Sequence, residues 1–137
     1  MIRIEGEHGG RRVFLPVAVL RADNPMDITH KTYTGLLDTG ATSSWISPRV
    51  VADLELFEIA KERVSFAMDE QVASIFLFRL GLFPASGQAN ELPFVFAETR
   101  GFQLRQRDDF DVILGMDVLS VTDFRMDRNF NWSLSFG

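Results

Sequence analysis

The sequence predicts an all-β fold with one or two short helices, and two kinds of pattern support this prediction. Apolar residues alternate along several short stretches, most regularly at Phe130, Trp132, Leu134 and Phe136. Such alternation is typical of strands that bury one face. The clearest helix start is Ser47-Pro48, where a capping serine precedes a proline that suits the first helical position.

Composition limits the classes of protein that the chain can represent. Its length of 137 residues suits one domain, which we expect to span residues 1–137. A net charge of −5 without a lysine or arginine cluster argues against a nucleic-acid partner. The absence of cysteine excludes disulfides, thiol catalysis and thiolate metal sites. Since the chain has neither a signal-peptide pattern nor a membrane-spanning apolar run, we expect a cytoplasmic protein without a membrane partner, unless a leader has been trimmed.

Three strands are predicted in the first third of the chain. Ile2 and Ile4 alternate with charged residues, which indicates a short edge strand. A second strand is expected over 12–20, at an edge or with a bulge, because Pro16 cannot donate a hydrogen bond to a neighbour. After a polar loop over 21–30, a third strand is predicted over 31–37.

The third strand leads into Asp38-Thr39-Gly40. The glycine allows a sharp turn, so the Asp38 carboxylate should be held at the tip of a tight loop backed by apolar core. Such a carboxylate is fixed and partly desolvated, which are the conditions that tune a pKa for proton transfer. The alternative is that this tripeptide is an ordinary turn at the end of a strand.

The middle of the chain predicts a short helix and a long hairpin. The helix is expected over 49–56, and its inward-facing residues should be Val50, Val51, Leu54 and Phe57. A β-hairpin is expected over 57–83, with its tip at Met68-Asp69-Glu70-Gln71. From its own pattern, this hairpin is a plain part of the sheet.

The remaining strands are shorter. We expect a turn over 86–90, a strand over 92–97, and a mobile polar loop over 98–109 that either lines a groove or is plain surface. A buried strand over 111–114 should lead into a helical turn over 116–119. The chain should end in a hairpin formed by 124–126 and 130–136, whose apolar face is either core or interface.

Two motifs together resemble the retropepsin-like aspartic proteases, especially the single-domain bacterial type. They are Leu-Leu-Asp-Thr-Gly-Ala-Thr at 36–42 and Val-Ile-Leu-Gly-Met-Asp-Val-Leu at 112–119. The resemblance runs from about Val13 to the end of the chain. It implies a retropepsin-like (acid protease) barrel in which the second motif packs beside the Asp-Thr-Gly loop and supports it.

The resemblance also implies site residues. Asp38 would be catalytic, and the residues that support its loop would be Thr39, Gly40, Ala41, Thr42, Leu114 and Gly115. The hairpin tip would be a flap that contacts substrate through Phe66, Ala67, Met68, Asp69 and Glu70. Unlike the viral enzymes, this tip contains no glycine.

Other polar residues suggest less. His8 and His30 are isolated, so no metal is expected. The cluster of Asp108, Asp109 and Asp111 is expected to be a solvated surface, with a cation site as the alternative. In the family, the position of Asp117 is structural, capping or pairing near the short helix.

These observations favour an aspartic endopeptidase that needs no cofactor. Because peptide hydrolysis of this type uses two carboxylates and the chain has one Asp-Thr-Gly sequence, the active form should be a homodimer with one Asp38 from each copy. The alternative is a retropepsin-like module with little catalytic activity that binds or scaffolds peptides.

Overall fold

The computed structural model describes residues 1–66, 69–84 and 91–137, and it is mostly β, as predicted. The strands are β1 (Ile2–Glu7), β2 (Phe14–Arg21), β3 (Lys31–Leu37), β4 (Trp45–Ile46), β5 (Glu58–Phe66), β6 (Asp69–Leu82), β7 (Phe94–Val95), β8 (Thr99–Gln103), β9 (Val112–Leu114), β10 (Asp123–Met126) and β11 (Asn131–Phe136). The helices in this part of the chain are α1 (Pro48–Asp53) and α2 (Met116–Leu119). Neither helix has the length that crossing a bilayer requires, and the described residues contain no other candidate span.

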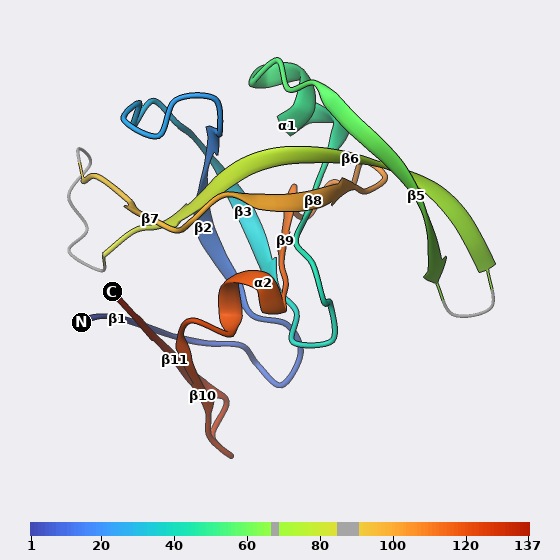
Figure 1. Ribbon diagram of the computed structural model, residues 1–137. Helices are drawn as coiled ribbons and strands as arrows, with labels where there is room; N and C mark the ends of the chain where they lie inside the picture. Colours follow the sequence, from blue (N-terminus) through green and yellow to red (C-terminus); the bar gives the residue numbers. More distant parts are fainter. Residues whose placement is uncertain (67–68, 85–90) are drawn as a thin grey trace.

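The larger sheet closes into a barrel. Its strands follow the order β2-β3-β9-β4-β8-β6-β5, and β2 also pairs with β6, which closes the ring. The pairs β3–β9 and β4–β8 are parallel, whereas β2–β3 and β5–β6 are antiparallel. The β5–β6 hairpin continues beyond the ring and extends away from the body (Figure 1).

A smaller sheet joins the two ends of the chain, in the order β1-β11-β10. Ile4 of β1 lies opposite Leu134 of β11, and both are buried. Trp132 and Phe136 are also buried, so the apolar face of the last strand belongs to the core of the protomer, while Phe130 remains half exposed. The alternative that this face forms an interface is therefore wrong for the three buried residues.

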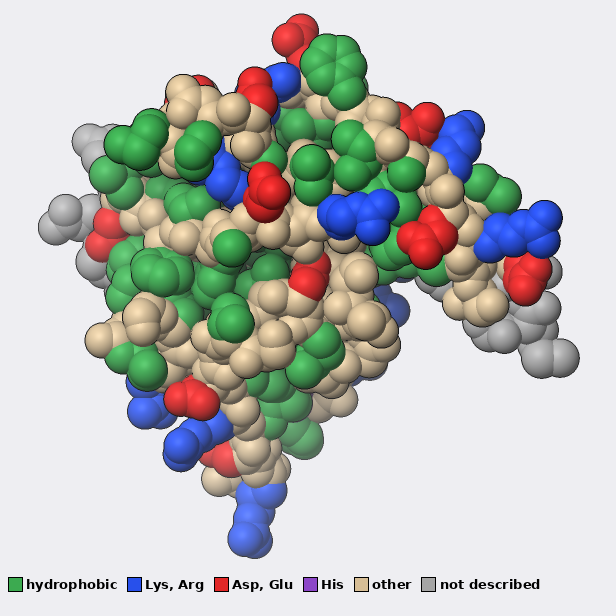
Figure 2. Space-filling model, viewed as in Figure 1, with side chains coloured by type: hydrophobic (Ala, Val, Ile, Leu, Met, Phe, Trp, Pro, Cys, Tyr) green, Lys and Arg blue, Asp and Glu red, His purple; other side chains and the backbone are tan. Residues whose placement is uncertain are grey.

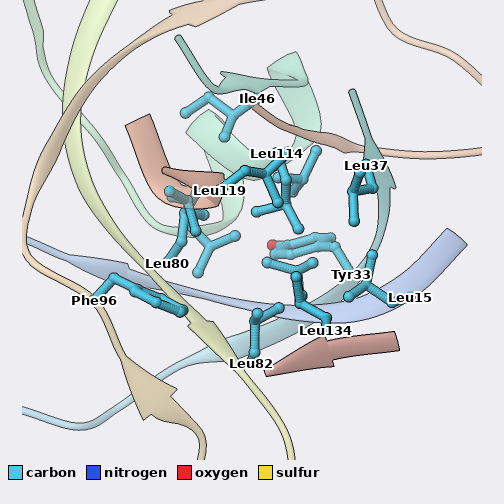
Figure 3. Packing of buried hydrophobic residues seen from close by; sticks show 14 of the residues in the cluster. Leu15, Tyr33, Leu37, Ile46, Leu80, Leu82, Phe96, Leu114, Leu119 and Leu134 are labelled. Carbon is cyan, nitrogen blue, oxygen red and sulfur yellow. The ribbon is translucent and has the colours of Figure 1, made fainter. Parts of the chain in front are cut away.

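The core lies between the barrel strands and the smaller sheet. Leu134 from β11 points toward Leu15 from β2 and Leu82 from β6, and Leu114 from β9 lies in the same cluster (Figure 3). Leu82, Leu114 and Leu134 have no exposed surface. Full burial of one such side chain contributes about 1.5–3 kcal/mol to folding. The cluster also includes Tyr33 and Leu37 of β3, so it fixes the strand that precedes Asp38.

Pro16 lies at a local edge, as predicted. β2 pairs with β3 from Phe14 onward, but its pairing with β6 begins only at Val17. Pro16 therefore has a neighbouring strand on one side only. Proline is tolerated at such an edge, because no second strand requires its missing N–H.

The predicted helix is shorter than expected, and the inward position of Phe57 is wrong. Ser47 caps α1 by accepting a hydrogen bond from the Val50 N–H, and Pro48 occupies the first turn, as predicted. Glu55 has a positive φ of 52°, which turns the chain away after the helix ends at Asp53. Phe57 consequently lies beyond the apolar face of the helix and is 77% exposed.

The hairpin forms as predicted, but three of the four residues predicted for its tip belong to a strand. Phe66 pairs with Asp69 and Ser65 pairs with Glu70, so Asp69, Glu70 and Gln71 belong to β6. Ala67 and the predicted tip residue Met68 lie outside the described residues, as does the turn predicted over 86–90.

The prediction of a loop over 98–109 is wrong for Thr99–Gln103, which forms β8, one of the strands of the barrel sheet. This strand carries no clear apolar alternation, so the sequence pattern hides it. Gly101 allows its close approach, because a Cβ there would lie 2.3 Å from the Phe78 ring and 2.7 Å from the Ser44 carbonyl oxygen. The strand predicted over 92–97 is also shorter, since β7 consists of Phe94 and Val95.

Candidate active site

Asp38 follows directly after the end of β3, beside the end of β9. Leu37 lies in parallel register with Leu114, and the Asp38 N–H donates a hydrogen bond to the Leu114 carbonyl at 3.0 Å. On the other side, the Leu37 N–H donates to the Val13 carbonyl at 3.0 Å. Backbone bonds to two neighbouring segments therefore set the position of Asp38 at the edge of the barrel.

The loop after Asp38 is tight, as the sequence predicts. The Gly40 N–H donates to Asp38 Oδ1 at 2.9 Å, and the Ala41 N–H donates to the Asp38 carbonyl at 3.2 Å. Asp38 is half-buried, whereas Thr39, Gly40 and Thr42 are exposed. One carboxylate oxygen is thus held by the loop, while no described residue donates to Oδ2.

The second motif packs directly against this loop. The Met116 N–H donates to the Ala41 carbonyl at 2.7 Å. A Cβ on residue 115 would lie 2.5 Å from the Ser43 carbonyl oxygen and 2.8 Å from that of Ala41, closer than real Cβ atoms come to other atoms. Residue 115 must therefore be glycine, because the backbone at Ala41 and Ser43 passes too close for a side chain. The structure thus brings Leu114 and Gly115 together with the Asp38 loop.

Asp117 connects the loop, α2 and β8. Its Oδ1 accepts hydrogen bonds from Ser44 Oγ at 2.7 Å and the Val118 N–H at 3.0 Å. Its Oδ2 accepts from the Ser44 N–H at 3.0 Å and Thr99 Oγ1 at 2.5 Å. Fully buried Ser44 in turn accepts a hydrogen bond from the Gly115 N–H at 3.1 Å. Asp117 is thus structural, as expected, and it joins three chain segments.

Ser44 and Thr99 are the parts of this network that the sequence did not reveal. Thr99 lies in a segment without strand periodicity, so no local signal connects it to Asp117. Ser44 lies two residues after the Asp-Thr-Gly motif at 36–42. Its hydroxyl, so close to a buried loop, is the one local signal that it makes a hydrogen bond there.

Asp111 is buried, so its assignment to a solvated acidic surface is wrong. Its carboxylate accepts hydrogen bonds from Ser47 Oγ at 2.8 Å, Gln106 Nε2 at 3.0 Å and the Arg49 guanidinium. Burial disfavours the charged form, but the hydrogen bonds from Arg49, Ser47 and Gln106 outweigh it and hold the pKa of Asp111 below its usual value. The network ties the start of α1 to the segment before β9.

The other members of that cluster remain at the surface, as expected. Asp108 and Asp109 are exposed, and Asp109 pairs with Arg107 at 3.2 Å and Arg12 at 3.5 Å. Among residues 1–66, 69–84 and 91–137, no three carboxylate or histidine side chains converge to form a metal site.

A groove of about 870 Å³ lies on the side of the barrel toward the hairpin. Its apolar lining includes Trp45, Val72, Phe110 and Ile113, and its polar lining includes Arg105. The β5–β6 arm stands clear of the body, with a hollow beneath it (Figure 2). Of the predicted flap residues, Glu70 is exposed and pairs with Arg63 at 3.9 Å.

The chain is similar to known proteins in sequence and in structure. The aspartyl protease family matches residues 24–118, a segment that includes both the Asp38 loop and Gly115. A retropepsin-like aspartic protease from Rickettsia conorii has a similar structure, with a TM-score of 0.62 and 16% identity over 98% of this chain and 90% of that chain. The retroviral protease-like domain of Ddi1 from Leishmania major gives a TM-score of 0.42 and 16% identity over 84% of this chain and 82% of that chain. No curated protein sequence matches significantly.

The similarity to the Rickettsia structure confirms the predicted fold as retropepsin-like. The family match covers more than half of the chain and contains the first motif and all but the last residue of the second. The chain belongs to the aspartyl protease family.

Proposed function

We propose that the protein is a homodimeric aspartic endopeptidase in which two copies each contribute Asp38 to one catalytic dyad. The observation that carries this proposal is the placement of Asp38, at the end of β3 with its N–H bonded to Leu114 and one carboxylate oxygen bonded to the Gly40 N–H. Since the chain contains one Asp-Thr-Gly sequence, a protomer holds half of the site.

The proposed reaction follows from two carboxylates that lie close together. Like charges at such a separation do not both ionise, so the pair shares one proton. The ionised Asp38 takes a proton from a water molecule, whose oxygen attacks the peptide carbonyl carbon while the protonated Asp38 donates a hydrogen bond to the carbonyl oxygen. Proton transfer to the amide nitrogen then allows the C–N bond to break, which releases an acid and an amine.

The residues around Asp38 have positions that suit supporting roles. Thr39 is exposed at the loop tip, where its hydroxyl would bond across the two-fold axis and hold the two loops in register. Ala41 is held by Met116 at the base of the loop, and Thr42 is exposed beside it. The β5–β6 hairpin would close over the peptide as a flap, through residues 66–70.

The test compares the wild type with Asp38→Asn in the cleavage of an unfolded protein. Asparagine keeps the size of the side chain but cannot transfer the proton, so cleavage should be lost while circular dichroism is unchanged. Asp123→Asn is the matched control, because Asp123 is an exposed carboxylate outside the site. Equal cleavage by Asp38→Asn and wild type would refute the mechanism. A wild type that binds peptides without cleaving them would support the alternative binding module.

A further inference from the structure

The groove beside the hairpin lies on the same face of the barrel as Asp38. Leu36 of β3 lies beside Ile113 of β9, and Ile113 lies beside Trp45 of β4. Residues that pair in this way point to the same side of a sheet. Asp38 is two positions after Leu36, so the alternation of the strand directs it to that side. Since Trp45 and Ile113 line the groove, the groove opens on the side of the sheet that carries Asp38, and a peptide bound at Asp38 would extend into it.

The apolar part of the groove is built from rigid side chains. Trp45 packs against Phe102 with ring centroids 4.8 Å apart, and Trp45 itself is only 8% exposed. Val72 of β6 also lines the groove and is 64% exposed, so its side chain is available for contact. This arrangement offers an apolar contact to a side chain of the bound peptide.

The charged part of the groove is positive. Among the described residues that line it, two are arginines, three are glutamines and none is a carboxylate, although the chain as a whole carries a net charge of −5. Arg107 is already engaged, because it bonds to Asp109 at 3.2 Å and lies over the Phe110 ring at 5.0 Å. Arg105 is exposed, and it makes no ion pair with any residue that the structure describes.

We propose that this groove selects substrates that carry an acidic side chain, and that Arg105 pairs with that carboxylate while an adjacent apolar side chain of the peptide lies against Trp45 and Val72. This inference rests on the proposed protease function and adds a substrate class to it. The positive lining supplies the charge complementarity, and a guanidinium presents donors in a planar fork that fits a carboxylate.

The size of the effect follows from exposure. An ion pair that remains in contact with water contributes less than a buried one, so exchanging glutamate for glutamine in the substrate should lower kcat/KM by about fivefold. The effect should appear mainly in KM, because Arg105 contacts the peptide away from the bond that is cleaved.

The experiment first maps the preferred cleavage position with a peptide library. It then compares a pair of blocked peptides, with acetylated and amidated ends, that differ by glutamate or glutamine at the acidic position. Wild type, Arg105→Gln, Arg105→Glu and the control Arg100→Gln are assayed with both peptides. Arg100 is a matched control because it is an exposed arginine of β8 outside the groove lining.

We expect the wild type and Arg100→Gln to prefer the glutamate peptide about fivefold, Arg105→Gln to show no preference, and Arg105→Glu to favour the glutamine peptide. Equal preference in the wild type and Arg105→Gln would overturn the inference, as would a library profile without any acidic preference. If no protein cleaves any peptide, the proposed function fails instead. Fluorescence anisotropy with the same labelled peptides then decides the inference by binding, since Arg105→Gln must lose the preference for glutamate.

Discussion

Removing the Asp117 carboxylate should strongly destabilise the protein. Asp117 accepts four hydrogen bonds, two of which come from Ser44, a residue with no exposed surface. Asp117→Ala leaves these donors inside the protein without a partner, and each unsatisfied buried group costs about 1–3 kcal/mol. Since the Val118 N–H also donates to the Gly115 carbonyl at 3.1 Å and Thr99 is partly exposed, the main cost falls on buried Ser44. We therefore expect a loss of about 3–4 kcal/mol in the free energy of unfolding. For a chain of this length, that corresponds to a decrease in Tm of roughly 10 °C.

Urea denaturation followed by tryptophan fluorescence measures this loss. Asp117→Asn keeps one oxygen acceptor and should lose about half as much as the alanine variant. Asp123→Ala is the control, because Asp123 is exposed and its truncation should change the free energy by less than about 0.5 kcal/mol. If Asp117→Ala unfolds at the same urea concentration as Asp123→Ala, the network does not stabilise the loop and the reasoning is refuted.

Four further outcomes follow from the site and its surroundings. If two copies form the dyad, specific activity should fall on dilution below the dimer dissociation constant, and excess Asp38→Asn should suppress wild-type activity; constant specific activity from a sedimenting monomer would exclude this. A dyad that shares one proton should give a bell-shaped rate profile centred on the acidic side of neutral, whereas a steady rise into alkaline pH would indicate another nucleophile. Gly115→Ala should displace the Asp38 loop, since its Cβ would lie 2.5 Å from the Ser43 carbonyl oxygen, and lower kcat by about 100-fold, with retention of wild-type kcat as the contrary result. The pKa of Asp111 is lowered in the folded state, so its charge stabilises the fold above the usual pKa of about 4. This stabilisation disappears as pH falls through the folded pKa. The free energies of unfolding of wild type and Asp111→Asn, measured by chemical denaturation, should therefore converge at low pH.

Elements with a strong local signal could be predicted from the sequence. β3 has the predicted bounds, because apolar residues lead into a glycine turn and the strand is buried on one face. The start of α1 is equally local, since Ser47 and Pro48 provide the cap and the first turn within adjacent residues. The two arms of the long hairpin were also evident, because their apolar residues alternate.

Elements whose stability comes from distant residues could not be predicted. β8 pairs with β4 and β6. Gly101 makes this pairing possible, because the Phe78 ring leaves no room for a Cβ there. The acidic neighbours of Asp111 in the sequence predict a surface position, but its partners Ser47 and Arg49 lie far back in the chain. Local composition contains no information on such contacts.

The two motifs identify the fold more directly than the activity, and the structure gives the physical reason. Gly115 is required because the backbone at Ala41 and Ser43 passes too close for a Cβ, so the second motif is a packing condition of the first. The Asp38 loop and the glycine that packs against it both lie within one chain, whereas the proposed dyad needs a second copy. The last strand cannot provide the contact between copies through Trp132, Leu134 or Phe136, because the core of the protomer already buries them. The contact should therefore be sought around the exposed Thr39 and the partly exposed Met116, which border the Asp38 loop itself.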